Sequence, residues 1–107
     1  MATIQYRLST RHDSRGNAQV MVRFYDGNRA FRAKSRILCP VSLWDSTVGM
    51  PVVNYKRMTA KDMGAAAARM KLDQISATVL SRWLEEKANA LDGWLQDVID
   101  DITIRKK

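Results

Sequence analysis

The 107-residue sequence is poor in the residues that stabilise small domains by covalent or metal crosslinks. It contains one cysteine, Cys39, and one histidine, His12. A single cysteine cannot close an internal disulfide, and the pair cannot supply the four ligands of a structural zinc site. No apolar run approaches the roughly 18 residues of a transmembrane helix, and residues 1–8 alternate without the apolar stretch of a signal peptide. These absences predict a reduced, cytoplasmic protein with no metal, no other cofactor and no membrane contact.

Catalytic motifs are also lacking. The sequence has no Walker loop, no GxGxxG and no HExxH. Cys39 and His12 are the only residues that could form a Cys–His nucleophilic pair, and nothing in the sequence orients them. We expect Cys39 to be a small buried residue beside Pro40, and His12 to lie at the surface. The sequence therefore predicts a protein without enzymatic activity.

Acidic residues are scarce relative to basic ones. Eleven Asp and Glu stand against 18 Lys and Arg, which gives a net charge of +7 and a pI near 10.0. The excess is uneven: residues 1–38 hold eight basic and two acidic residues, whereas residues 39–107 hold ten and nine. Seven of the first eight are arginine, which makes planar, bidentate contacts with phosphate and guanine. The charge distribution indicates an acidic partner for the first third of the chain.

That basic segment, residues 3–38, alternates with a period of two and predicts three strands. Turn clusters at 13–17 and 26–28 separate the strands, and Gly27 supplies the positive φ of a tight hairpin. The expected product is an antiparallel meander with one apolar and one polar face. Residues 39–58 form a long connection, in which we expect Trp44 to anchor the loop and Val52-Val53 to form a short strand or an extended edge segment.

The second half of the sequence predicts helices. Thr59 is a good N-cap for a helix over 60–88, with Asp62 completing a capping box. One helical stripe is expected to cover the apolar face of the sheet, and a second to pack on a short helix over 92–103. The acidic residues of that last helix are expected to form a solvated face. The first stripe comprises Ala68, Leu72, Ile75, Val79 and Trp83. The second stripe comprises Met70, Ala77, Leu80, Leu84 and Ala88. The acidic residues of the last helix are Asp97, Asp100 and Asp101. The fold class is therefore predicted as α+β: a three-stranded antiparallel sheet on a long helix, followed by a short C-terminal helix.

The polar face of the predicted sheet is the candidate functional surface. The major groove of DNA admits a β-ribbon, Arg and Gln contact base edges there, and hydroxyl groups bind phosphates. A hydrated outer face without function is the alternative, and the density of arginine argues against it. The predicted DNA-binding residues are Gln5, Arg7, Ser9, Gln19, Arg23, Tyr25, Arg32, Lys34 and Arg36.

The order of motifs over residues 4–83 resembles the N-terminal arm-type DNA-binding domain of Bacteroides-type tyrosine recombinases, the integrases of phages and conjugative transposons. The shared pattern begins with Tyr6-Arg7-Leu8 and a charged turn with Gly16, and continues through Val22-Arg23-Phe24 and a Gly27 turn. It closes with Ile37-Leu38, Pro40, Trp44-Asp45 and Gly49, and the long helix follows with Leu72 and Ile75. The third strand is more basic than that pattern requires.

The resemblance implies sequence-specific binding of double-stranded DNA at arm-type sites, in support of DNA integration and recombination. It implies an arm-binding domain over residues 1–88, with residues 89–107 forming a short helix and the start of a linker to a core-binding domain. Other integrase protomers and that domain would be further partners, and the protein would associate with the nucleoid. The family's catalytic residues lie beyond this sequence, so no strand cleavage is expected.

Two other functions remain open at this point. One is an RNA-binding α/β domain, although the RNP1 aromatic pattern is absent. The other is a protein-interaction adaptor, in which the second helical stripe and Trp94 would dock a partner and the basic sheet would be incidental.

Overall fold

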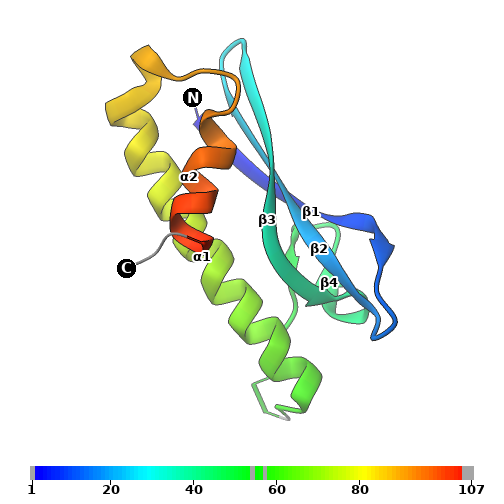
Figure 1. Cartoon of the computed structure of the whole chain (residues 1–107). Coiled ribbons are helices and arrows are strands. Elements are labelled where there is room, and N and C mark those ends of the chain that lie inside the picture. Colours follow the sequence, from blue (N-terminus) through cyan, green and yellow to red (C-terminus); the bar gives the residue numbers. More distant parts are fainter. Residues whose placement is uncertain (1, 54, 57, 105–107) are drawn as a thin grey trace.

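The computed structural model describes residues 2–53, 55–56 and 58–104. It confirms the α+β class: a three-stranded antiparallel sheet packs on a long helix and a short C-terminal helix (Figure 1). The elements are β1 (Ala2–His12), β2 (Asn17–Asp26), β3 (Arg29–Pro40), the 3₁₀ turn η1 (Val41–Leu43), β4 (Trp44–Asp45), β5 (Met50–Pro51), α1 (Ala60–Glu86), the 3₁₀ turn η2 (Lys87–Asn89) and α2 (Trp94–Thr103).

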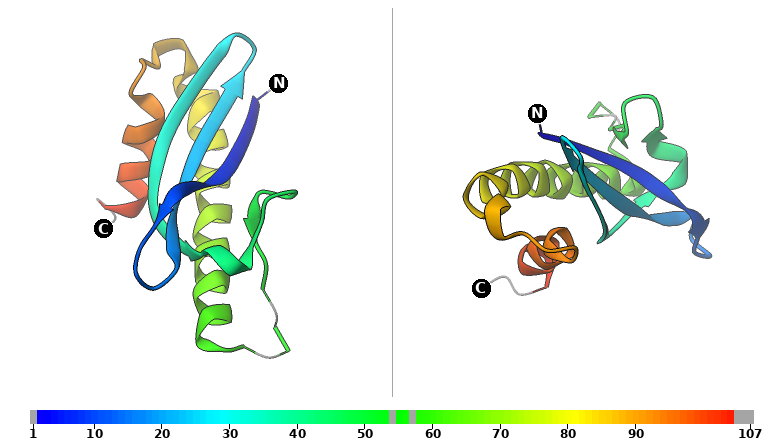
Figure 2. Two further views of the ribbon diagram at one scale, coloured as in Figure 1. Left: turned by 90° about the vertical axis from the view of Figure 1, so that its right-hand side faces the viewer. Right: turned by 90° about the horizontal axis from the view of Figure 1, so that it is seen from above.

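The sheet has the order β1-β2-β3, as the meander predicts. A two-residue turn joins β2 to β3, with Asp26 opposite Arg29 and Gly27 at a φ of 61°. Apolar residues of β2 and β3 alternate into the core, where Val20, Val22 and Phe24 are fully buried. The opposite face of all three strands points away from both helices (Figure 2).

Two irregularities interrupt the alternation near one end of the sheet. Between β1 and β2 the register shifts after Leu8, and between β2 and β3 it shifts between Gln19 and Met21. In the second case Gln19 pairs with Leu38 and Met21 with Lys34, so β3 carries two extra residues. Such bulges bend a strand and redirect the side chains within it.

The connection from β3 to α1 differs in part from its prediction. Trp44 packs against the core, as expected of an anchor. The short strands, however, are β4 and β5, where Trp44 pairs with Pro51 and Asp45 with Met50. Val52 and Val53 lie just after β5 and outside any strand, so the prediction of a strand at these two residues was wrong. The Val52 N–H donates to the Leu43 carbonyl at 2.7 Å, in register with the Trp44–Pro51 pair, so the hydrogen bonding of the hairpin continues one residue past β5.

Helix α1 begins as predicted. The Thr59 side chain accepts from the backbone N–H of Asp62, and the Asp62 carboxylate accepts from the backbone N–H of Thr59, which completes a capping box. The first predicted stripe is buried along its whole length, and it comprises Ala68, Leu72, Ile75, Val79 and Trp83.

Helix α2 packs on β3 and on α1, on the same side of the sheet as α1 (Figure 2). It buries Trp94, Leu95, Val98 and Ile99 in the same core that α1 covers. The second stripe of α1 does not meet α2, contrary to the prediction: the side chains of Met70 and Leu84 are exposed. One buried stripe of α1 is enough to contact both the sheet and α2, because α2 lies at the β3 edge of the sheet, beside the first stripe.

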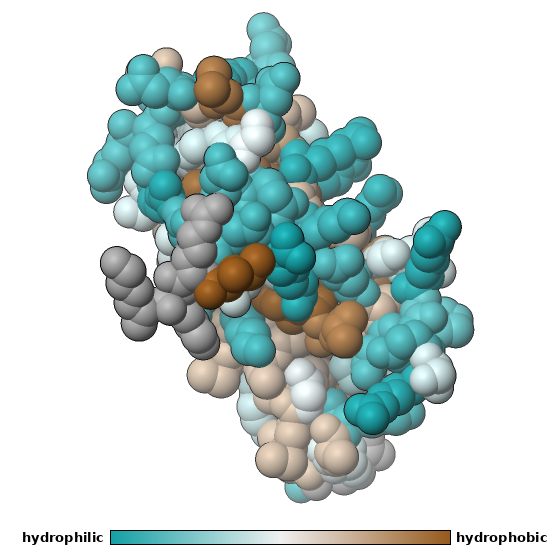
Figure 3. Space-filling model, in the orientation of Figure 1, coloured by the Kyte–Doolittle hydropathy of each residue, from teal (hydrophilic) through white to brown (hydrophobic). Residues whose placement is uncertain are grey.

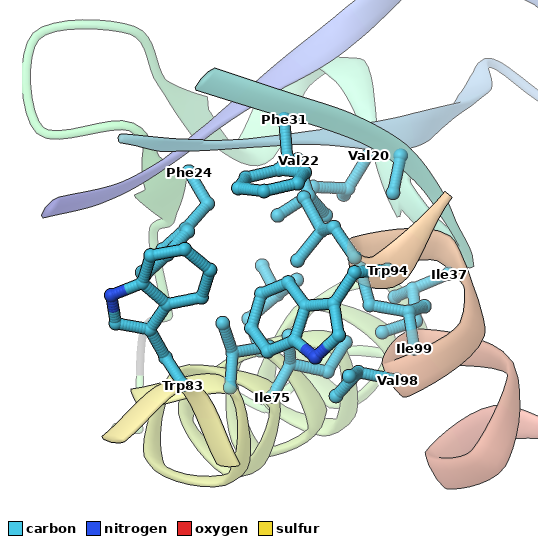
Figure 4. Packing of buried hydrophobic residues seen from close by; sticks show 14 of the residues in the cluster. Val20, Val22, Phe24, Phe31, Ile37, Ile75, Trp83, Trp94, Val98 and Ile99 are labelled. Carbon is cyan, nitrogen blue, oxygen red and sulfur yellow. The ribbon is translucent and has the colours of Figure 1, made fainter. Parts of the chain in front are cut away.

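Four aromatic rings lie together in the core (Figure 4). Phe24 and Phe31 come from the sheet, Trp83 from α1 and Trp94 from α2. Their centroids lie 5.0–6.3 Å apart in tilted or edge-to-face pairs, the arrangement that aromatic quadrupoles favour. This cluster joins the sheet and both helices into one hydrophobic core.

Candidate nucleic-acid interface

Three cross-strand rows form the centre of the outer face. Antiparallel pairing places Gln5 beside Arg23 and Arg23 beside Arg32, which makes one row across the sheet. The adjacent rows are Arg7–Met21–Lys34 and Thr3–Tyr25–Ala30. With strands about 4.8 Å apart, a row is about 10 Å wide, comparable with the roughly 12 Å width of the DNA major groove.

These nine positions hold four cations, Arg7, Arg23, Arg32 and Lys34, and no carboxylate. The three cations on the outer strands are exposed, and Arg23 on the central strand is half-buried. The Arg23 guanidinium lies 5.8 Å from the centroid of the Tyr25 ring, close enough for a cation–π contact that orients it. In Figure 3 hydrophilic side chains dominate the margin of the molecule over the strands.

Neither carboxylate of residues 1–38 lies in these three rows. Asp26 accepts a 2.6 Å hydrogen bond from Trp83 Nε1 on the core side, and this bond holds the pKa of its carboxyl below the usual range. Asp13 lies in the turn after β1 and accepts from the backbone N–H groups of Arg15 and Asn17. Those bonds lower the pKa of Asp13 as well. Both acids are therefore charged at neutral pH while the centre of the outer face stays free of negative charge.

Arg36 is separated from the other predicted site residues. It lies within the irregular part of β3 with a φ of 62°, and its backbone N–H donates to Gln19 Oε1 at 3.0 Å. Its Nε lies 3.3 Å from Asp100 Oδ1 on α2. The period-two pattern placed Arg36 with Arg32 and Lys34, but the bulge turns its side chain toward the edge of the sheet.

The same contact corrects the expectation for the acidic run. Asp100 pairs with Arg36, and Asp101 lies 2.9 Å from Arg82 Nη1 of α1. Arg82 also bonds Glu86 four residues along its own helix. Asp100 and Asp101 thus link α2 to the sheet and to α1, whereas Asp97 is exposed as predicted.

Ser9 and Gln19 lie at the far end of the outer face. They line a shallow hollow of about 440 Å³ together with Arg11, His12, Asp13 and Lys34, so one carboxylate lies at this end of the face. Ser9 Oγ accepts from the Arg11 N–H within the bulged part of β1. Arg11 was not among the predicted site residues, although continuing the alternation 5, 7, 9, 11 would have included it.

Arg29 has a structural role that the sequence did not indicate. Its guanidinium donates to the carbonyls of Lys87 (2.9 Å) and Ala90 (2.6 Å), just beyond the C-terminus of α1. It also lies over the rings of Phe31 and Trp83, 5.2 and 5.3 Å from their centroids. A cation in this position complements the helix dipole. Arg29 therefore contributes to the charge of the sheet segment without belonging to its outer face.

Other kinds of site find little support in the described part of the chain. Residues 2–53, 55–56 and 58–104 contain no group of three or more His, Cys, Asp or Glu that could hold a metal ion. Cys39 is buried, and its burial raises the pKa of the thiol to about 11, as expected for a structural residue. Within the same residues no helix is both long and apolar enough to cross a membrane.

Comparison of the chain with protein-family models, with curated proteins and with solved structures found no match.

Proposed function

We propose that the outer face of the sheet binds double-stranded DNA by insertion into the major groove. The observation that supports this most directly is the row Gln5–Arg23–Arg32, flanked by Arg7 and Lys34. These are the side-chain types that contact guanine and adenine edges and phosphates. The helices lie behind the sheet and leave this face open to a duplex (Figure 2).

The charge of the two layers favours the same orientation. The cations of the outer face are not neutralised by neighbouring carboxylates in their rows, whereas Asp100 and Asp101 of α2 are engaged in ion pairs with Arg36 and Arg82. A polyanion approaching the molecule is therefore attracted to the sheet and finds less free positive charge at α2.

In the more specific form of the proposal, the chain is the arm-type DNA-binding module of a tyrosine recombinase. The order of motifs from Tyr6 to Trp44 supports this, as does a sheet whose apolar side is covered by a long helix. Such a module would bind DNA without cleaving it, and its partners would include other protomers of the recombinase.

Titration of labelled DNA measured by fluorescence anisotropy tests the proposal. Mixed-sequence and integration-site duplexes should bind, and a structured RNA should compete less well than duplex of equal length. Arg23→Ala and Arg32→Ala should each weaken binding by roughly 1–3 kcal/mol where the arginine contacts a base edge. Lys61→Ala removes the same charge from an exposed position on α1 and is the matched control. Equal affinities for all three variants and the parent protein would refute a role for the outer face.

A further inference from the structure

Two bulges face each other across the central strand at one end of the outer face. From Leu8 to His12, β1 advances four residues. Its partner β2 advances only two over the same pairs, from Val20 to Ala18, so β1 carries two extra residues here. The bulge of β3 lies on the other side of β2, beside Gln19. Bulges bend the strands that carry them, and Figure 2 shows β1 bending sharply before the turn to β2.

The hollow of about 440 Å³ lies between these bulges, and we call it the double-bulge hollow. Arg11 of β1 and Lys34 of β3 line it from the two outer strands, and Gln19 and Met21 line it from β2 between them. Gln19 Oε1 accepts from the Arg36 N–H at 3.0 Å, which draws the Gln19 side chain toward β3. The hollow therefore spans all three strands and opens on the face proposed to bind DNA.

Cations outnumber carboxylates in the double-bulge hollow. Arg11 and Lys34 are both exposed, and neither belongs to an ion pair among the residues that the structure describes. Asp13 is the one acid among the described lining residues, and its Oδ1 accepts two backbone N–H groups of the β1–β2 turn, each at 2.9 Å. Two cations on opposite sides of the hollow thus remain available to an anion that enters it.

The distance of the hollow from the central rows indicates which part of a duplex it would meet. Gln19 follows Arg23 by four residues along β2, which corresponds to about 13 Å of extended strand. That distance is comparable with the roughly 12 Å width of the major groove. Over such a length the groove curves around the duplex axis while the strand stays extended. A sheet that lies on the base edges at Arg23 therefore rises to the sugar-phosphate rim of the groove at the double-bulge hollow.

We propose that the double-bulge hollow holds one phosphodiester of the DNA backbone between Arg11 and Lys34. The proposal rests on the DNA-binding function proposed above, and it adds a contact that does not depend on base sequence. Arg and Lys bind phosphate oxygens through charge-assisted hydrogen bonds, and such contacts fix the position of a protein on the duplex. Leu38, which is 54% exposed on the same lining, offers an apolar surface to the adjoining deoxyribose.

Anisotropy titrations of a mixed-sequence duplex test the role of Arg11. Arg11→Ala removes one charge-assisted contact and should raise the dissociation constant about tenfold. Arg15→Ala removes the same charge from an exposed position in the adjoining turn, outside the hollow, and should raise it no more than about twofold. Circular dichroism verifies that both variants fold. Equal affinities of the two variants, with Arg23→Ala weakened, would overturn the phosphate site and leave DNA binding by the central rows intact.

A double-mutant cycle tests whether Arg11 and Lys34 share one phosphate. The effects of Arg11→Ala and Lys34→Ala on the dissociation constant should depart from simple multiplication by at least about threefold, because both side chains act on the same group. Arg11→Ala and Arg32→Ala act on separate parts of the duplex, so their effects should multiply to within about twofold. Multiplicative effects in both pairs would overturn the shared phosphate.

Asp13→Asn tests the sign of the charge that the hollow receives. The Asn side chain keeps an oxygen that can accept the two N–H groups of the turn, but it removes a negative charge beside the proposed phosphate. DNA affinity should therefore rise at least about twofold. Asp97→Asn removes the same charge from an exposed position on α2 and is the matched control, which should change the affinity less. An affinity of Asp13→Asn that is no higher than that of Asp97→Asn would overturn the proposal.

Discussion

The side-chain amide of Gln96 on α2 makes two hydrogen bonds with the backbone of Lys34 on β3. The Lys34 N–H donates to Gln96 Oε1 at 2.9 Å, and Gln96 Nε2 donates to the Lys34 carbonyl at 3.0 Å. The amide thus takes the place of a neighbouring strand at an edge of the sheet. Unpaired edges invite association with other chains, and a covering helix is one of the ways in which proteins protect them. The same two bonds fix the backbone from which the Lys34 side chain extends to the outer face.

Gln96→Ala should therefore destabilise the fold by about 1–2 kcal/mol, because it leaves the Lys34 N–H and carbonyl without these partners. Urea unfolding monitored by tryptophan fluorescence measures the effect. Gln74→Ala, at an exposed position on α1, should change the stability by less than about 0.5 kcal/mol. A Gln96→Ala variant as stable as Gln74→Ala would show that the edge contact contributes nothing.

Arg29 should behave differently from the arginines of the outer face. Its loss removes two charge-assisted hydrogen bonds at the end of α1, and Arg29→Ala should cost roughly 2–3 kcal/mol of unfolding free energy. Arg32→Ala, three residues away at an exposed position, should cost less than about 0.5 kcal/mol. The effects on DNA affinity should be in the opposite order: Arg32→Ala should bind DNA more weakly than Arg29→Ala. Equal stabilities of the two variants would contradict the capping role of Arg29.

The salt dependence of DNA binding should report the number of cations on the outer face. Four phosphate contacts, one for each of Arg7, Arg23, Arg32 and Lys34, predict a log–log slope near −3.6. Arg36 would steepen it to about −4.5 only if it left Asp100 on binding. Anisotropy titrations between 50 and 300 mM salt (roughly a sixfold range) measure the slope. A slope near zero would exclude electrostatic binding by this face.

The buried hydroxyl of Tyr6 should make the stability of the fold fall at alkaline pH. Its hydroxyl donates to the Leu72 carbonyl at 2.9 Å and lies 2.6 Å from Ser76 Oγ, and burial raises its pKa from 10.0 to about 12. The folded state binds this proton more tightly than the unfolded state, so the contribution is complete below pH 10 and is lost as the pH rises toward 12. Unfolding free energies of Tyr6→Phe and the parent should differ most below pH 10 and converge above it. A difference that is independent of pH would rule out this titration.

Local patterns in the sequence were sufficient for the three strands of the sheet, for both α-helices and for the class of fold, but not for the short β4–β5 hairpin. Period-two alternation and the Gly27 turn specified the three strands, and the Thr59–Asp62 capping box fixed the start of α1. The buried stripe from Ala68 to Trp83 followed from helical spacing alone. These features depend on residues within one or two turns or strands of each other, so a single sequence contains the information. The grouping of Gln5, Arg7, Arg23, Arg32 and Lys34 on one side of the sheet followed from the same alternation.

Contacts between distant segments were decided by the tertiary structure. The bulge that directs Arg36 to Asp100, the use of Arg29 as a cap for α1 and the choice of α2 between two stripes all join residues that lie far apart in the sequence. Periodicity assigns a side chain to a face but cannot say which partner that face meets. The sequence by itself therefore determined a sheet with an arginine-rich face and a helix with two apolar stripes. Only the packing of α2 on β3 decided which arginines remain on that face, since it brings Asp100 to Arg36. The same packing decided which stripe of α1 stays exposed, because α2 cannot cover both sides of α1 and lies on the side of the first stripe.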